Sequence, residues 1–200
     1  MNRRLALLLT LFFGMGVVMA SCAGLETKPS EANFKAPAVK LDSIQVSYYE
    51  GFWYYGKATP ELGKAPAGGG SSPVSLDFVF TITNPNDFPV SYESSSFYLY
   101  FEDYELRVVN DSNPMWIPPG KTNTKVLNVT LTPYSTFAKF LLASKELAAK
   151  RGDKPWEKIE QWWNGLPNMS FPIDLKEGGF TFSADNVVKV VPVVTRYPSK

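Results

Sequence analysis

The sequence contains no histidine and only one cysteine, Cys22. Without histidine, the chain cannot build a Ser-His-Asp triad, a Cys-His pair or a His-ligated metal site. A single cysteine also excludes an intramolecular disulfide. These absences remove most common hydrolase designs, and we expect no cofactor and no metal.

Neither sign of charge is in clear excess, because 20 Lys and Arg oppose 19 Asp and Glu, for a net charge of +1. The lysines are scattered along the chain, and the sequence has no internal repeat. A nucleic-acid-binding surface needs clustered positive charge. The composition therefore predicts no nucleic-acid partner.

The N-terminus has the pattern of an export signal. Arg3 and Arg4 precede an apolar run from Leu5 to Val18, and small residues follow it up to Cys22. The run is shorter than the roughly 20 residues that a membrane-spanning helix needs. We favour a cleaved signal peptide, residues 1–21, over a permanent transmembrane anchor.

Cys22 lies where the signal would be cut, within "MASC". This segment resembles the bacterial lipobox, whose cysteine receives a diacylglycerol group and then an acyl chain on its new amino terminus. The resemblance implies attachment to a membrane through lipid on Cys22. Ala23 follows instead of aspartate, which points to the outer membrane, facing the periplasm, if the cell has one.

Residues 22–40 contain two prolines and no apolar periodicity, and we interpret them as a flexible tether. Residues 41–200 are rich in Val, Phe and Tyr and are long enough to bury one core. We therefore expect one domain, with strands over 41–132, a helical insertion over 133–166 and C-terminal strands over 168–196.

Apolar and polar residues alternate in several segments, as half-buried antiparallel strands require. The pattern is clearest in "SLDFVFTIT", residues 75–83, and recurs in "DSIQVSYY", where Ile44, Val46 and Tyr48 share a face. "SFYLYF", "KVLNVTLT", "YELRVV", "SFPIDL" and "NVVKVVPVV" complete the expected strands. Pro192 in the last of these predicts an edge strand or a bulge.

Two helices are expected between the strands. Thr132 provides an N-cap before Pro133, and the helical spacing that follows ends at Gly152. A second helix begins after Asp153, which could cap it, and carries Trp156, Trp162 and Trp163. Its apolar stripe could pack over the open end of the sheets or form a contact surface for lipid or a partner.

A sharp turn interrupts the strand pattern at "TNPND", residues 83–87. Pro85 presets the backbone for a turn, and the side chains of Asn84 and Asn86 can bond to amides that no strand serves. This arrangement, followed by "SFYLYFEDYEL" and "IPPGKTNTKVLNVTLTP", resembles the late-embryogenesis-abundant type 2 family, also called the water stress and hypersensitive response (WHy) domain. The likeness covers about residues 41–132.

The family resemblance implies an antiparallel β-sandwich of the immunoglobulin or fibronectin III type, a link to desiccation stress and no catalytic residues. Glu102, Asp103 and Glu105 fall at an expected hairpin, where solvated carboxylates are favoured over an acid/base pair. The aromatic run over 48–55 includes Trp53, Tyr54 and Tyr55. These rings could close the core or form an apolar platform.

The sequence thus leads to one main hypothesis. The protein is a non-enzymatic, lipid-anchored envelope protein that protects partly unfolded proteins or membranes when water is scarce. The alternative is a module that binds lipid or a partner in an apolar groove between the sheets and the tryptophan-bearing helix.

Overall fold

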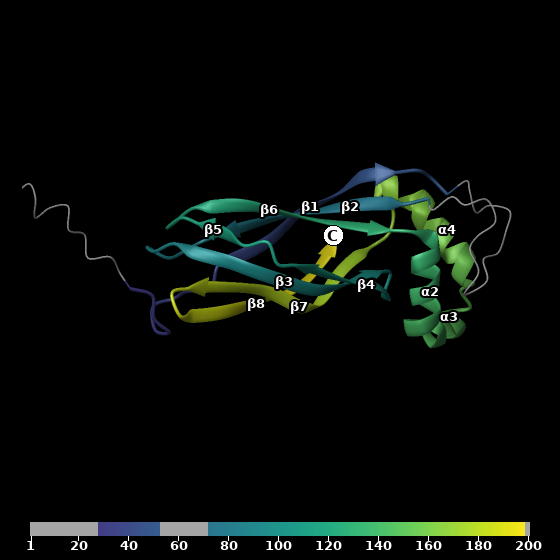
Figure 1. Cartoon of the computed structure of the whole chain (residues 1–200). Coiled ribbons are helices and arrows are strands. Elements are labelled where there is room, and N and C mark those ends of the chain that lie inside the picture. The colour runs from purple at the N-terminus through teal and green to yellow at the C-terminus, as the bar shows by residue number, and fades with distance from the viewer. Residues whose placement is uncertain (1–27, 53–71, 199–200) are drawn as a thin grey trace, which may run out of the picture.

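The structure is a computed structural model that describes residues 28–52 and 72–198. The described residues form two stacked sheets, with helices at one end and an N-terminal arm at the other (Figure 1). All strand pairings are antiparallel. The predicted sandwich of mainly β structure, with helices in the C-terminal half, is confirmed.

The first sheet has the strand order β1-β2-β6, and the second has the order β4-β3-β7-β8, with β5 pairing to β3. The strands are β1 (Ala38–Tyr49), β2 (Val74–Thr83), β3 (Val90–Phe101), β4 (Tyr104–Asp111), β5 (Met115–Ile117), β6 (Thr122–Leu131), β7 (Ile173–Ala184) and β8 (Val187–Tyr197). Consecutive strands β2 and β3 belong to different sheets. The turn between them therefore crosses from one layer to the other.

Every second residue of β2 points into the space between the sheets, as the alternation predicts. These residues are Val74, Leu76, Phe78, Phe80 and Ile82, and each is at most 1% exposed. From the opposite sheet, the ring of Phe180 packs edge-on against Phe80, with centroids 4.9 Å apart. Each such buried side chain contributes about 2 kcal/mol, so these rings hold the two layers together.

A bulge changes the predicted face of β1. Ile44 is buried as expected, but Tyr48 is 49% exposed. The pairing with β2 shifts between Val46 and Tyr48. The extra residue turns Tyr48 to solvent and directs Tyr49 toward the helices, where its hydroxyl donates to the Trp163 carbonyl at 3.0 Å.

β8 is an edge strand, as Pro192 predicts, and among the described strands it hydrogen-bonds to β7 alone. Near its middle, β7 approaches the backbone of β3 closely at Gly178. A Cβ atom at Gly178 would lie 1.9 Å from the Ser96 carbonyl oxygen. Only glycine permits this contact between the two backbones.

The helical region lies between β6 and β7 and comprises α2 (Pro133–Ala143), α3 (Lys145–Arg151), α4 (Pro155–Gly165) and the 3-10 turn η1 (Leu166–Asn168). Thr132 caps α2 as predicted, accepting the Ser135 amide at 3.2 Å. The single helix expected up to Gly152 is interrupted at Ser144, which ends α2 and begins α3. Gly152 does end α3, with φ of 72°.

Asp153 does not cap α4, which corrects the sequence-based expectation. Lys154 occupies the N-cap position and makes no side-chain capping bond. The Asp153 carboxylate instead accepts a hydrogen bond from the Tyr104 hydroxyl at the start of β4. A capping rule considers only neighbours in sequence, whereas this partner is 49 residues away.

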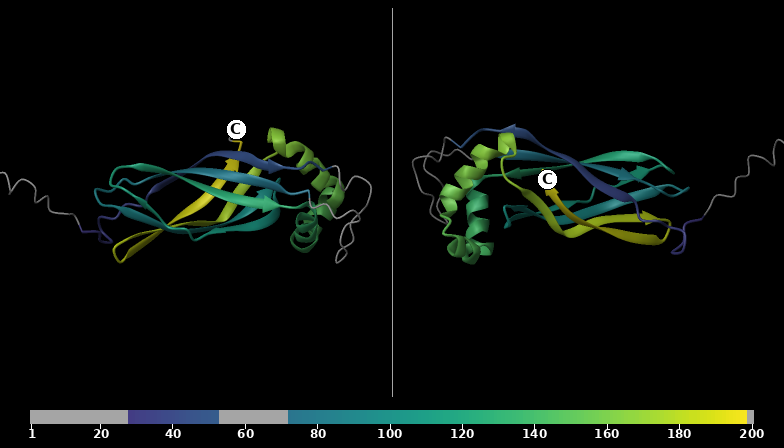
Figure 2. Two further views of the ribbon diagram at one scale, coloured as in Figure 1. Left: turned by 45° about the horizontal axis from the view of Figure 1, so that its top comes forward. Right: turned by 180° about the vertical axis from the view of Figure 1, so that it is seen from behind.

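The helices close one end of the sandwich (Figures 1 and 2). The ring of Trp162 lies 5.7 Å from Phe101 and 5.5 Å from Tyr104, between centroids, at the end of the β3–β4 hairpin. In the part of the chain that the structure describes, no helix is long and apolar enough to cross a membrane.

Packing begins before the predicted domain boundary at residue 41. β1 starts at Ala38, and Phe34 is only 2% exposed. The Phe34 ring contacts Phe88 with centroids 6.1 Å apart. Residues 28–40, the described part of the expected tether, therefore lie on the sandwich.

Candidate functional site

The Asn84-Pro85-Asn86 turn connects the two sheets, and its first residue is completely buried. The Asn84 amide nitrogen Nδ2 donates to the carbonyl oxygens of Phe88 at 2.9 Å and Ile117 at 3.1 Å. Its side-chain oxygen accepts the backbone amide of Asn86 at 3.0 Å. Asn84 thus satisfies backbone groups that no strand ladder serves, which is why the turn can be buried.

Asn86 joins this turn to the N-terminal arm. Its side-chain oxygen accepts the Lys35 amide, and its Nδ2 donates to the Lys35 carbonyl, each at 2.8 Å. On the other side, the Asn86 carbonyl accepts the Gly120 amide at 3.0 Å. The turn therefore fastens the arm, both sheets and the β5–β6 loop to one another.

The arm itself is folded by local contacts. Asn33 accepts the Ser30 amide at 2.8 Å and donates from Nδ2 to the Lys28 carbonyl at 2.9 Å. The Phe34 amide donates to the Ser30 carbonyl at 2.9 Å, which closes one turn. Phe34 then enters the core, so the arm is anchored from Lys28 onward.

Residues 79–154 match the family model described as Late embryogenesis abundant protein, LEA_2. The match supports the relation to the LEA_2 family that the sequence motifs suggested. It covers the Asn-Pro-Asn turn, all of β3 to β6, and helices α2 and α3. The LEA_2 segment begins later than the likeness predicted from residue 41, and it extends past Thr132 through α3.

Comparison with solved structures finds matches of low sequence identity, among them the two that follow. A crystal structure of a protein from Archaeoglobus fulgidus has 9% identity and a TM-score of 0.43, covering 78% of this chain and 94% of that one. The solution structure of a protein assigned to the late embryogenesis abundant proteins has 14% identity and a TM-score of 0.35, covering 94% and 85%. No curated protein matches the chain.

The predicted aromatic contact surface is divided between the core and the periphery. Trp162 and Trp163 are fully buried, and Trp156 is half-buried. The Trp163 indole donates to the Ser72 carbonyl at 2.9 Å, and Trp156 packs on Phe52 with centroids 5.3 Å apart. For Trp162 and Trp163, this favours packing over an exposed contact surface, because neither ring reaches solvent.

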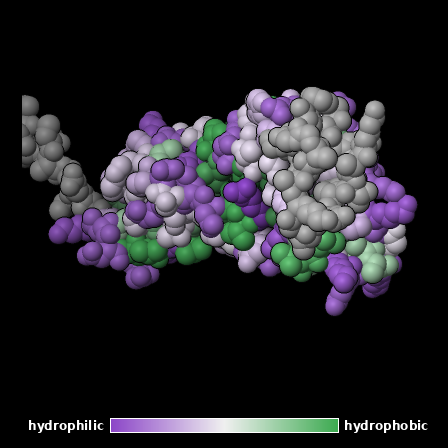
Figure 3. Space-filling model, turned by 45° about the vertical axis from the view of Figure 1, so that its right-hand side comes forward, coloured by the Kyte–Doolittle hydropathy of each residue, from purple (hydrophilic) through white to green (hydrophobic). Residues whose placement is uncertain are grey.

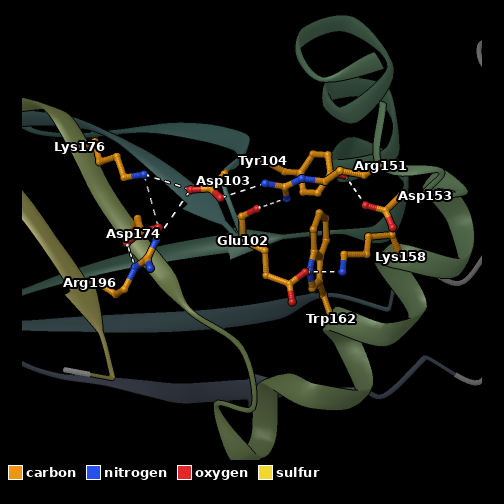
Figure 4. Close-up of polar contacts among 10 residues, drawn as sticks. All are labelled: Glu102, Asp103, Tyr104, Arg151, Asp153, Lys158, Trp162, Asp174, Lys176 and Arg196. Atoms are coloured by element: carbon orange, nitrogen blue, oxygen red, sulfur yellow. Dashed lines mark hydrogen bonds and ion pairs between the residues drawn. The ribbon is translucent and has the colours of Figure 1, made fainter. Parts of the chain in front are cut away.

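A charged cluster connects the β3–β4 hairpin to the helices and to β7 (Figure 4). Glu102 and Asp103 form the hairpin turn with φ of 49° and 74°. Glu102 pairs with Lys158 and accepts the Trp162 indole N–H at 3.0 Å. These carboxylates were expected to be simply solvated, but they are held by partners from the helical region.

Asp103 extends this cluster from the hairpin to strand β7 of the same sheet. It pairs with Arg151 at 3.1 Å and with Lys176 at 3.4 Å. Next to it, the buried Asp174 receives two parallel hydrogen bonds from Arg196, at 2.7 and 2.8 Å. The bidentate pair holds the C-terminal part of β8 to β7.

The pKa shifts of Asp103 and Tyr104 keep these two groups in their ordinary charge states at neutral pH. The hydrogen bond from Arg151, helped by Lys176, lowers the pKa of Asp103. Burial, together with the hydrogen bond to Asp153, raises the pKa of Tyr104 to about 12. Neither group is poised to exchange protons near pH 7, so we interpret the cluster as a clamp between hairpin and helices.

The outer face of β8 is unusually apolar. Val188, Val190 and Val194 are 56%, 63% and 80% exposed. Their neighbours across the sheet, Ser183 opposite Val188 and Thr181 opposite Val190, are small. The valines therefore form an accessible apolar stripe along an edge strand, which we call the β8 stripe.

Trp116 is another exposed apolar residue, with 66% of its surface accessible. It lies in β5, a short strand that the sequence pattern did not predict. Elsewhere, the side shown in Figure 3 carries apolar surface as separate patches between hydrophilic regions. The signal that could have identified Trp116 is its place in "NPMWIPPG", since prolines on both sides limit strand pairing.

Four predicted site residues, Cys22, Trp53, Tyr54 and Tyr55, lie outside the described residues. Within the described ranges, no group of three or more Asp, Glu, Cys or His could hold a metal ion. The described residues present the β8 stripe, sheet edges and fixed ion pairs. Such features suit binding through a surface.

Proposed function

We propose that this is a non-enzymatic, lipid-anchored envelope protein that limits damage to proteins when water is scarce. Two independent observations support the proposal. The LEA_2 match at residues 79–154 indicates a water-stress-related protein. The N-terminal export pattern and the lipobox-like "MASC" indicate an envelope location with lipid on Cys22.

The proposed lipid anchor keeps the protein attached to a membrane surface. Each acyl methylene that enters the bilayer contributes about 0.8 kcal/mol, so several chains on one residue hold the protein firmly. Ala23 favours the periplasmic face of the outer membrane in a cell that has one. Cys22→Ala should move the protein from the membrane to the soluble fraction, and unchanged membrane retention would overturn the anchor.

The observation that carries the protective role is the β8 stripe. Partly unfolded chains expose apolar side chains and unpaired backbone groups, and an edge strand with accessible valines can offer partners for both. Pro192 interrupts the ladder in the middle of β8, which limits how far any added strand extends. Contacts of this kind are weak and reversible, as protection during drying requires.

Drying experiments on the fragment 23–200 test this role. A labile enzyme is dried with and without the fragment, and aggregation after rehydration is measured by light scattering against an equal mass of albumin. The fragment should suppress aggregation more than albumin does. Equal performance would overturn client protection.

A matched pair of variants tests the β8 stripe itself. Val190→Thr with Val194→Thr keeps side-chain shape but removes about 1 kcal/mol of apolar burial per site, so the amount needed for half-protection should rise several-fold. Val126→Thr is the control, because Val126 is 51% exposed but lies on β6 in the other sheet. If all three proteins protect equally, the β8 stripe is not the contact surface.

The alternative function is a module that binds lipid or a partner in a groove beside the tryptophan-bearing helix. The rings of Trp162 and Phe140 lie 5.9 Å apart there, and Tyr104 stacks on Phe140 at 4.7 Å. This close packing favours action at the surface over binding in that groove. Native mass spectrometry of the fragment from cells distinguishes the two, because co-purified lipid would favour the alternative.

A further inference from the structure

The end of the sandwich opposite the helices carries the N-terminal arm and β5 (Figure 1), the strand that contains the exposed Trp116. Lys28, the first described residue, and Trp116 line the same cavity of about 400 Å³. Pro29, Asp87, Phe88, Pro89, Pro119 and Asp185 complete its lining. We call this end of the molecule the tip.

The arm keeps the tip close to any anchor at Cys22. Asn86 holds both backbone groups of Lys35, and Phe34 is buried, so the arm is fastened to the sandwich. Only six residue steps separate Cys22 from Lys28. A fully extended chain of that length spans about 20 Å, so a lipid on Cys22 brings the tip within that distance of the bilayer.

We propose that the tip rests on the bilayer surface, with Trp116 in the headgroup region. This inference rests on the lipid anchoring proposed above. An indole ring has an apolar body and one N–H donor, which suits the boundary between acyl chains and headgroups. Among the tryptophans of the described residues, Trp162 and Trp163 are buried and Trp156 is half-buried, so Trp116 is the one presented to solvent.

The charges at the tip identify the kind of lipid surface. The cavity lining contains Lys28, Asp87 and Asp185, and the arm and loops beside it add Lys35, Lys121, Lys189 and Glu31. Charges of the two signs are thus nearly balanced at the tip, which gives little attraction to anionic lipids, whereas Pro89 and Pro119 add apolar surface beside the indole. The partner is therefore a zwitterionic lipid surface, held by the indole and not by charge.

This orientation has a consequence for the rest of the molecule. The sheets run from the tip to the helices, so the helical end points away from the bilayer (Figures 1 and 2). β8 starts beside Asp185 at the tip and runs toward the helical end, so Val190 and Val194 of the β8 stripe lie farther along the sandwich and stay accessible. A protein standing on its tip can therefore contact soluble chains while the anchor holds it in place.

The single cysteine allows a test that does not depend on lipidation in the cell. Fragment 22–200 is coupled through Cys22 to phosphatidylcholine vesicles that contain a maleimide headgroup lipid and brominated acyl chains. Bromine quenches an indole that lies at the interface, so emission assigned to Trp116 should fall about twofold. That contribution is the difference between the original fragment and Trp116→Phe.

Trp156→Phe is the matched control, since Trp156 belongs to α4 at the helical end. It should remain quenched as strongly as the unmodified fragment, whereas Trp116→Phe should lose most of the quenching. Equal quenching in Trp116→Phe and the parent would overturn the proposal, as would absence of quenching in the parent. A concentration-dependent blue shift of Trp116 before coupling would place a second copy on the tip and overturn it too.

Failure of this test and failure of the anchor are distinguishable. If Cys22→Ala leaves the protein on membranes in cells, the anchor is wrong, whatever the coupled vesicles show. If the anchor holds but coupled Trp116 is not quenched, the tip does not rest on the bilayer.

Discussion

The side chain of Asn86 binds the backbone of Lys35 as a neighbouring strand would, with one bond to the amide and one to the carbonyl, each 2.8 Å long. These residues are 51 positions apart. A single amide side chain thus substitutes for a strand pair and fastens the N-terminal arm to the turn between the sheets. This contact holds the N-terminal arm in place at the tip.

Replacing Asn86 by alanine should destabilise the protein and release the arm. Asn86→Ala removes two part-buried bonds to the Lys35 backbone and a buried bond to the Asn84 side chain, at a cost of about 2–3 kcal/mol in the free energy of unfolding. Urea denaturation measures the loss, and hydrogen exchange should show reduced protection at Lys35. Lys35→Ala is the control, since Asn86 contacts only its backbone; a comparable loss there would contradict this account.

The bidentate pair between Arg196 and Asp174 should matter more than a surface pair. Asp174 is 2% exposed, so Arg196→Met leaves a buried carboxylate with Lys176 at 3.5 Å as its remaining ion-pair partner. We expect a loss of about 2 kcal/mol in unfolding free energy. Lys154→Met breaks the exposed pair with Glu157 and should cost less than about 0.5 kcal/mol. Equal losses would show that burial does not govern these pairs.

Asp103 should make stability depend on pH. Its pKa is lowered in the folded state by Arg151 and Lys176, so folding favours the carboxylate. The stabilisation is present above the unfolded pKa of about 4 and is lost as the pH falls through the lower, folded value.

Asp103→Asn tests this dependence, because asparagine tolerates the φ of 74° at this position. At pH 7 the variant should be less stable by under about 1 kcal/mol, since Asp103 is half-exposed. Thermal unfolding at pH 7 and pH 2.5 should show the difference shrinking in acid. A difference that stays constant with pH would indicate a change in packing instead.

Two glycines should respond differently to the same substitution. At Gly178, a new Cβ would meet the Ser96 carbonyl oxygen at 1.9 Å, and neither backbone can move without separating β3 from β7. We expect Gly178→Ala to cost more than about 3 kcal/mol. At Gly120 there is open space but a φ of 61°, so Gly120→Ala should cost only about 1 kcal/mol. Circular dichroism melts would compare them, and similar melting temperatures would refute the close contact.

Much of the fold could be predicted from local pattern. The alternation in "SLDFVFTIT" predicted β2, Thr132 with Pro133 predicted the start of α2, and Pro192 predicted an edge strand. Each rule depends on a period or a dihedral angle that neighbouring residues set. The structure agrees with these local preferences because tertiary packing favours the same elements at the same residues.

The features that the sequence predicted wrongly or left undecided have a common cause. Tyr48 faces solvent because the register between β1 and β2 shifts next to it. Asp153 does not cap α4 because its carboxylate accepts a hydrogen bond from Tyr104. The tryptophan stripe of α4 could have been core or contact surface, and only its partners decided that Trp162 and Trp163 are buried. In each case the deciding group is far away in the sequence.

By itself, the sequence determined where strands alternate, where the chain turns and what chemistry is missing, because periodicity, proline and the lack of histidine act locally. Tertiary structure alone decided that Asn86 would hold Lys35, that the valines of β8 would face solvent and that Trp116 would share a tip with the N-terminal arm. Burial and hydrogen bonding across the fold depend on which distant segments meet. That information is absent from any single stretch of chain.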